Sequence, residues 1–263
     1  MQTSNPPIIS LTTDFGERDG YVGIMQGVIL SICPNVTLTK LSHLIPAQDV
    51  QTAAFVLYQS FNYYPTHTIH CVVVDPGVGS KRRGIAVRTD WGTFVGPDNG
   101  VFSLVFSAPN VNVLEAVTLT NPAYQLPVVS STFHGRDIFA PAAAHLAKGI
   151  PLHRLGPPAI NLVRLAWAGP TDYKPCRVIH IDHFGNLILS LTEKDIDNPD
   201  HVAFAIAGKI IKSLRRTFTD VAEGDLLAYV GSTKHHVEIA IRNGNAAQTL
   251  STKVGDVVEL LED

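Results

Sequence analysis

The segment Cys71-Val-Val-Val-Asp75-Pro-Gly-Val-Gly-Ser80-Lys-Arg82-Arg-Gly84 decides the fold. Its apolar, β-branched start predicts a buried strand over residues 68–74. The strand must end at Asp75, because Pro76 fixes the backbone φ angle and the following glycines permit a turn. A carboxylate at the carboxyl end of a buried strand is typical of ligand sites in open α/β sheets. In this segment alone, an aspartate that caps its own turn, with surface arginines, is an equally good interpretation.

The chain before this segment repeats the same alternation of elements. Strands are predicted over residues 8–13 and 36–41, with helices over 21–32 and from about 46 to 61. This β-α-β-α-β series predicts a mostly parallel sheet with helices on both faces. The rest of this α/β domain is predicted as strands over 84–88, 92–95 and 111–117, a helix from Val101 and a helix over 138–148.

The pattern changes after about residue 156, where Gly156-Pro-Pro, Gly169-Pro170 and Lys174-Pro175 indicate a linker. Beyond it, short apolar runs separated by turn residues predict a small all-β, barrel-like or sandwich domain. We therefore expect an α/β domain over residues 1–160, a linker over 161–175 and a β domain over 176–263. The predicted strands of the second domain are 177–181, 187–191, 202–206, 209–211, 226–230, 237–241 and 257–261.

The bulk properties exclude several classes of protein. Apolar residues make up 45% of the 263 residues and charged residues 16%, which favours a sizeable core and argues against disorder. The formal net charge of −3 argues against a nucleic-acid partner. Three widely spaced cysteines, Cys33, Cys71 and Cys176, predict neither a disulfide framework nor a zinc site. With no signal-peptide pattern and no apolar run of about 18 residues, we expect a cytoplasmic protein without a membrane partner.

Four polar loops follow apolar segments, around Asp14, Asp75, Asp98-Asn99 and His134-Gly-Arg136-Asp137. In a parallel sheet such loops can converge at one edge, although each alone is weak evidence because aspartates often cap helices. One chemistry that fits them is a divalent-metal phosphohydrolase, whose metal ligands would be Asp14, Asp75, Asn99 and His134. Another is a metal-free site in which Asp, Arg and His side chains orient a water molecule. Dinucleotide, P-loop and G-x-S-x-G patterns are absent.

Six motifs, in order along nearly the whole chain, resemble the S-adenosyl-L-methionine hydroxide adenosyltransferase family, which is related to the fluorinases and chlorinases. They are Thr-Thr-Asp14-Phe-Gly, Val-Asp75-Pro-Gly-Val-Gly, Gly-Pro-Asp98-Asn-Gly, Thr-Phe-His134-Gly-Arg-Asp, Asp182-x-Phe-Gly-Asn and Glu238-Ile-Ala. The resemblance implies that water or hydroxide attacks C5′ of S-adenosyl-L-methionine, giving adenosine and methionine without a metal or other cofactor. It also implies a homotrimer with sites between subunits.

The resemblance assigns roles residue by residue. The set that handles the water falls on Asp75, Arg82 and His134, and the ribose-binding carboxylate on Asp14. The halogenating relatives carry Tyr where Asp75 stands, so the sequence agrees with the hydrolase branch. Adenine and methionine contacts fall on Asp19, Phe133, Asp182, Phe184, Asn186, Phe218, Ser232 and Arg242. A metal-dependent phosphatase or nucleotidase, and a non-catalytic sensor of adenosine or S-adenosyl-L-methionine, are the alternatives.

Overall fold

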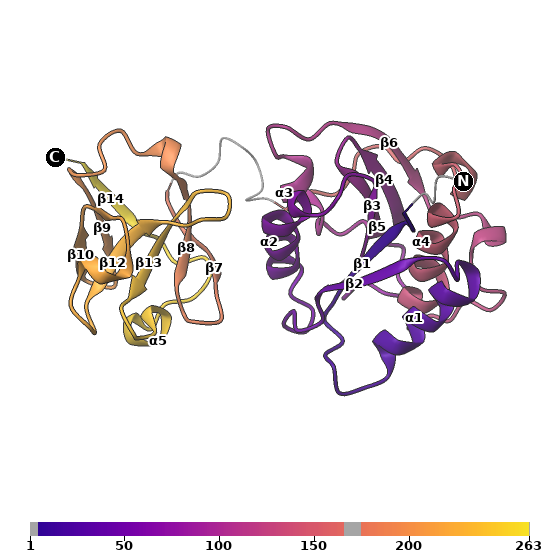
Figure 1. Ribbon diagram of the computed structural model, residues 1–263, viewed down its shortest axis with the longest axis horizontal. Coiled ribbons are helices and arrows are strands. Elements are labelled where there is room, and N and C mark those ends of the chain that lie inside the picture. The colour runs from indigo at the N-terminus through magenta and orange to yellow at the C-terminus, as the bar shows by residue number, and fades with distance from the viewer. Residues whose placement is uncertain (1–4, 166–174, 263) are drawn as a thin grey trace. The chain divides into compact units, whose positions relative to one another are not determined.

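The computed structural model describes residues 5–165 and 175–262 (Figure 1). The chain divides into two compact units, spanning residues 1–168 and 169–263. Most of the predicted linker over 161–175 lies outside the described residues.

The first unit is built on a six-stranded sheet. Neighbouring strands are parallel except at β4, which is antiparallel to both its neighbours. The α/β class and the mostly parallel sheet that the sequence predicts are therefore confirmed. The order across the sheet is β2 (Thr37–Ser42), β1 (Ile8–Thr13), β3 (Thr68–Val73), β5 (Gly92–Pro97), β4 (Gly84–Thr89) and β6 (Val113–Thr118).

Strand β3 is buried along its whole length because helices cover both faces of the sheet. The side chains of β3 and of Val74, the residue after it, alternate between two hydrophobic clusters, with Cys71 and Val73 in one and Val72 and Val74 in the other. The first cluster includes residues of α1 (Tyr21–Ile32) and α4 (Ala140–Ala147), and the second includes residues of α2 (Val50–Ser60) and α3 (Ser103–Phe106). Figure 1 shows these two pairs of helices on opposite sides of the sheet.

Most predicted helix positions are confirmed, and the boundaries have local causes. Asp49 caps α2, as its side chain accepts a hydrogen bond from the Thr52 N–H at 2.8 Å. Two expectations are wrong in detail. The helix expected from Val101 is only the four-residue α3, and the helix expected at 138 begins earlier, as the π-helical turn η3 (Gly135–Phe139) that continues into α4. Shorter turns are η1 (Phe61–Tyr63), η2 (Pro122–Tyr124) and η4 (Leu152–Leu155).

The sheet reverses its winding direction between β1 and β3. The chain leaves β1 through α1 to the outer strand β2, and then returns through α2 over the other face to β3. Residues Thr13 and Val73 are register partners at the carboxyl ends of these two strands. The loops that begin at Asp14 and Asp75 therefore start side by side, at the type of crevice where doubly wound sheets bind ligands.

The second unit is largely β, as predicted, with two sheets around one hydrophobic cluster. The short strand β11 and the helix α5 (Ala246–Leu250) were not predicted, and the last strand begins two residues later than expected. One sheet has the order β11 (Leu214–Arg215), β12 (Leu226–Val230), β13 (His236–Ile241), β8 (Leu187–Thr192) and β7 (Val178–Ile181); the other has β10 (Lys209–Lys212), β9 (Val202–Ile206) and β14 (Glu259–Glu262). Two short turns, η5 (Glu193–Asp195) and η6 (Phe218–Asp220), complete it.

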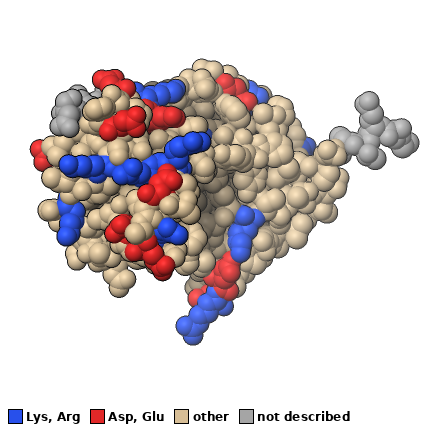
Figure 2. Space-filling model, turned by 60° about the vertical axis from the view of Figure 1, so that its left-hand side comes forward, with Lys and Arg blue, Asp and Glu red and all other residues tan. Residues whose placement is uncertain are grey.

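The surface carries mixed charge. On the face drawn in Figure 2, Lys and Arg side chains are interspersed with Asp and Glu and form no broad basic patch. None of the helices within residues 5–165 and 175–262 has both the length and the hydropathy to cross a bilayer.

Candidate active site

The loop that follows β3 is folded back by two successive turns. The Val78 N–H bonds the Asp75 carbonyl and the Ser80 N–H bonds the Gly77 carbonyl, both at 3.2 Å. Gly79 has φ +77° and lies so close to the Ser131 carbonyl that any Cβ would overlap it. The loop therefore returns Arg82 toward Asp75 and is packed against the loop that carries His134.

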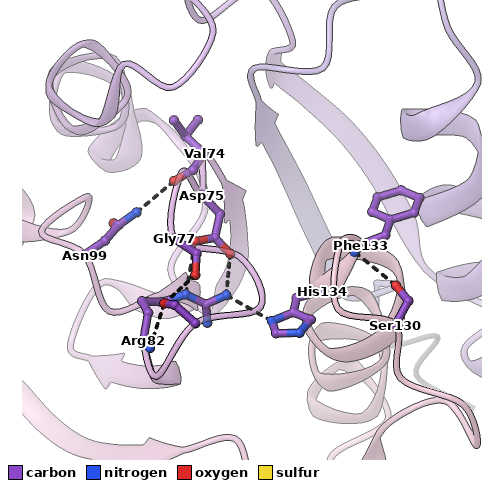
Figure 3. A network of polar contacts seen from close by, with 9 residues as sticks. Val74, Asp75, Gly77, Arg82, Asn99, Ser130, Phe133 and His134 are labelled. Carbon is purple, nitrogen blue, oxygen red and sulfur yellow. Dashed lines mark hydrogen bonds and ion pairs between the residues drawn. The ribbon is translucent and has the colours of Figure 1, made fainter.

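Three side chains from these two loops are joined by hydrogen bonds (Figure 3). Arg82 Nε donates to Asp75 Oδ1 at 3.0 Å, and Arg82 Nη2 donates to Asp75 Oδ2. The same Nη2 lies 3.0 Å from His134 Nδ1. The side chains of Arg82 and Asp75 are only 8% and 5% exposed, so their ion pair is well shielded from water.

The contact with Arg82 fixes the protonation state of the histidine. A guanidinium has donors only, so His134 Nδ1 must accept the hydrogen bond and the imidazole proton must reside on Nε2. Burial, together with the positive charge of Arg82, holds the pKa of His134 below its ordinary value. Burial raises the pKa of Asp75, against the opposing effect of Arg82. The result is a neutral imidazole beside a carboxylate that is easier to protonate than usual.

A pocket of about 380 Å³ opens beside this group, at the β1–β3 crevice. Asp75 and His134 line it, whereas Arg82 does not. Asp14 lines it from the end of β1, with Oδ2 accepting the Gln48 N–H at 2.8 Å. The remaining lining residues are Phe15, Tyr21, Ala47, Gln48, Val73, Pro76, Val78, Thr132, Phe133 and Gly135.

One wall of the pocket is aromatic. The rings of Phe15, Tyr21 and Phe133 pack together with centroid separations of 5.4 to 5.8 Å. Tyr21 is 47% exposed although it lines the pocket. Such a wall next to a carboxylate suits a ligand that combines an apolar or aromatic surface with hydroxyl groups.

Comparison with known proteins places this chain in a family. The model of the S-adenosyl-L-methionine (SAM) hydroxide adenosyltransferase N-terminal domain matches residues 9–156, and that of the corresponding C-terminal domain matches residues 176–259. The chain belongs to the SAM hydroxide adenosyltransferase family. The resemblance read from the six motifs is thereby confirmed.

Several relatives match over almost the full length. Proteins named (R)-S-adenosyl-L-methionine hydrolase from Thermus thermophilus and Salinispora tropica are 39% and 40% identical, over 95% of this chain and 97% and 96% of theirs. A fluorinase from Nocardia brasiliensis is 27% identical over 99% of both chains. A crystal structure of a protein from Thermotoga maritima, 35% identical, matches with a TM-score of 0.87 over 96% of this chain and 100% of that one.

Some polar residues of the predicted loops, and one residue assigned to the family site, do not line the pocket. Asp98 binds Arg83 through its side chain and accepts the Val163 N–H at 2.9 Å. Asp137 binds Arg136 and accepts the Ser130 N–H at 2.8 Å, and thus fastens the loop before His134. Asp98 and Asp137 therefore stabilise the loops around the pocket and do not line it. Of these two predicted polar loops, only the second brings a predicted residue, His134, to the pocket. Asp19 is exposed in the loop before α1 and does not line the pocket.

The geometry does not fit the metal-ligand set considered for a phosphohydrolase. Asn99 donates its amide to the Val74 carbonyl at 2.9 Å and accepts the Val101 N–H at 3.2 Å, so it serves its own turn. The Arg82 guanidinium stands between Asp75 and His134, where a shared cation would have to bind. In the part of the chain that the structure describes, no three or more His, Cys, Asp and Glu side chains group as metal ligands.

In the C-terminal unit, Asp182 organises a tight loop. Its carboxylate accepts hydrogen bonds from the Phe184 and Asn186 N–H groups and from the Asn186 side chain, at 2.8 to 2.9 Å. Phe184 is 71% exposed at the tip of this loop, whereas Asn186 is buried. The loop therefore holds an aromatic ring in solvent on a rigid support, a geometry suited to stacking.

The other residues expected in this unit lie on nearby turns. Phe218 contacts the Tyr229 ring at 5.0 Å, and Ser232 is exposed in the turn between β12 and β13. Arg242 Nη1 donates to the Val221 carbonyl at 2.8 Å. Tyr229 also donates to the buried Glu238, whose pKa burial raises.

Sequence reasoning did not single out several lining residues of the pocket. Phe15 follows Asp14 directly and could have been found from that adjacency. Gln48 has φ +67°, a conformation that few non-glycine residues adopt, and no sequence pattern marks it. Val78 and Thr132 reach the pocket only because the two loops are packed together.

Proposed function

We propose that this chain hydrolyses S-adenosyl-L-methionine to adenosine and L-methionine. We further propose that its substrate is the (R)-sulfonium epimer, because the names of its relatives specify (R)-S-adenosyl-L-methionine. The observation that carries the proposal is the hydrogen-bonded group of Asp75, Arg82 and His134 at the edge of a pocket that also contains Asp14. Activity therefore requires C5′ of the bound nucleoside to lie beside Asp75 and His134.

The reaction is a displacement at carbon. The oxygen of a water molecule forms a bond to C5′ while the bond from C5′ to sulfur breaks, and the electron pair of that bond leaves with methionine as a neutral thioether. The sulfonium is already a good leaving group, so the protein must mainly hold the water in line with the bond that breaks. Alignment of this kind can contribute up to about 7–11 kcal/mol.

Asp75 takes the proton of the water in this proposal. His134 is unsuited to that step, because its Nδ1 is occupied by Arg82 and its Nε2 already carries a hydrogen. The Nε2–H can instead donate to the water and fix its orientation. Burial raises the pKa of Asp75, which makes it a stronger base than an ordinary carboxylate, while Arg82 opposes this rise and favours the ionised form.

Asp14 and the aromatic wall form the nucleoside subsite in this proposal. A carboxylate that accepts two hydrogen bonds matches the vicinal hydroxyl groups of ribose, and Phe133 packs against the nucleoside. The adenine and methionine contacts on Asp19, Asp182, Phe184, Asn186, Phe218, Ser232 and Arg242 belong to the same proposal. So do a homotrimer with its sites between subunits and a cytoplasmic location, which three unpaired cysteines favour.

The test is product analysis with the purified protein. Separated (R) and (S) epimers of S-adenosyl-L-methionine are incubated with and without a metal chelator, and adenosine and methionine are quantified by chromatography. We expect equimolar products from the (R) epimer and no effect of chelator. Tight retention of adenosine without turnover would replace the proposal by a sensor, and metal-dependent release of phosphate from a nucleotide would replace it by a phosphatase.

Asp14→Ala is expected to weaken nucleoside binding. A hydrogen bond to a charged group contributes about 1.5–3 kcal/mol, so the Kd for adenosine should rise roughly 10- to 150-fold. Isothermal titration calorimetry with adenosine measures this change. Asp90→Ala is the matched control, because Asp90 also follows a strand but bonds Asn112 outside the pocket. An unchanged Kd in Asp14→Ala would remove Asp14 from the subsite.

A further inference from the structure

Arg82 has a third neighbour besides Asp75 and His134. Its guanidinium carbon lies 5.4 Å from the centroid of the Phe139 ring, over the ring face. Phe139 is fully buried, so its ring is held in place and makes a favourable cation–π contact with the guanidinium. The cation is thereby enclosed by a carboxylate, an imidazole and an aromatic ring.

The π-helical turn explains how His134 and Phe139 can both reach Arg82. In a regular α-helix, residues five apart lie about 140° apart around the axis and point to different sides. The chain here forms a π turn over Gly135–Phe139, and the Ala140 N–H bonds the carbonyl of Gly135, five residues earlier. This wider turn brings residue i+5 back above residue i. His134 and Phe139 therefore meet the same guanidinium.

Gly84, at the start of β4, leaves the space that this arrangement needs. A Cβ at this position would lie 3.0 Å from Phe139 Cε1 and 3.7 Å from Arg82 Nη1. The shorter distance is closer than ordinary van der Waals contact, so a side chain here would require the ring to shift by a few tenths of an ångström. Gly84, which is far from the π turn in sequence, therefore also contributes to the contact between Phe139 and Arg82.

We propose that Phe139 is a positioning residue for the reaction, and that it holds the Arg82 guanidinium in the single plane that serves Asp75 and His134 together. This rests on the proposed function. Arg82 without the ring can turn about its side-chain bonds, keep one bond to Asp75 and release His134. The imidazole then loses the donor that selects its tautomer, and the water loses its fixed orientation.

The first test compares Phe139→Leu and Gly84→Ala with Phe94→Leu. Phe94 is a fully buried phenylalanine in the other hydrophobic cluster of the same unit, away from Arg82, so its replacement matches the loss of core volume. We expect kcat to fall about 10- to 100-fold in Phe139→Leu and Gly84→Ala, with KM for S-adenosyl-L-methionine nearly unchanged. Phe94→Leu should lower the melting temperature as Phe139→Leu does and keep kcat. Equal effects of Phe139→Leu and Phe94→Leu on kcat would overturn the proposal.

The second test needs no activity and therefore separates this proposal from the proposed function. Nitrogen NMR of the His134 ring in the folded, ligand-free protein reports which nitrogen carries the proton. We expect the Nε2–H tautomer in the wild type and in Phe94→Leu, and a mixture of tautomers in Phe139→Leu and Gly84→Ala. A single Nε2–H tautomer in all four proteins would show that the ring does not position Arg82, whatever the wild-type protein hydrolyses.

Discussion

Asp75→Asn is expected to reduce kcat about 10²–10⁴-fold and to leave the Kd for adenosine close to the wild-type value. The amide has the shape of the carboxylate but cannot take the proton of the attacking water. The nucleoside subsite around Asp14 and Phe133 is untouched by the change. Single-turnover measurement of adenosine formation, together with calorimetry for binding, separates the two quantities.

Asp98→Asn is the control for this experiment. Asp98 is also a buried carboxylate paired with an arginine in the same unit, but its partners are Arg83 and the Val163 N–H, outside the pocket. Both variants should lose stability, and only Asp75→Asn should lose turnover. If Asp75→Asn hydrolyses S-adenosyl-L-methionine at a rate within threefold of Asp98→Asn, roughly 0.7 kcal/mol in barrier height, Asp75 is not the base.

The fold was predictable because its signals are local. The four residues before Asp75, residues 71–74, are all apolar, as expected of a strand that is covered on both faces, and β3 is such a strand. The β-α-β-α-β order then determines the side-by-side ends of β1 and β3. The helix α5 was missed because five residues after the Asn245 cap carry too short a periodic pattern to be distinguished from a loop.

The site was only partly predictable from the sequence. Asp75 belongs to it and Asp98 does not, and this difference depends on contacts with residues far away in the chain. Both aspartates follow apolar residues and precede a glycine-containing turn. Their partners decide their positions, and Asp98 accepts from Val163, 65 residues later in the chain. The π turn is equally hidden, because Gly135–Phe139 has the composition of an ordinary helix start and the extra residue per turn depends on tertiary packing.

Arg82→Gln is expected to move the acid limb of the kcat profile to higher pH. Burial already raises the pKa of Asp75, and Arg82 is the main group that opposes this rise. Without the cation the carboxylate protonates at a still higher pH, so the base is lost earlier as the solution is acidified. Arg83→Gln, which removes the neighbouring arginine that binds Asp98, should leave the limb in place. Rates measured across the acid range compare the two, and identical profiles would contradict this role of Arg82.

The same variant makes a stability prediction with a definite sign. Removing one partner of a buried ion pair typically costs about 3–5 kcal/mol because the other charge is left uncompensated. A carboxylate whose folded-state pKa lies above its unfolded value loses stability as pH rises between those two values, and Arg82→Gln widens that window. The deficit in unfolding free energy against wild type should therefore be large at neutral pH and small in acid, as denaturant titration at several pH values can measure.

Arg82→Lys restores charge but not the forked geometry, so it should recover stability more fully than kcat. A pH-independent deficit would mean that Asp75 is not ionised beside Arg82, and the proton acceptor would then have to be sought elsewhere in the pocket.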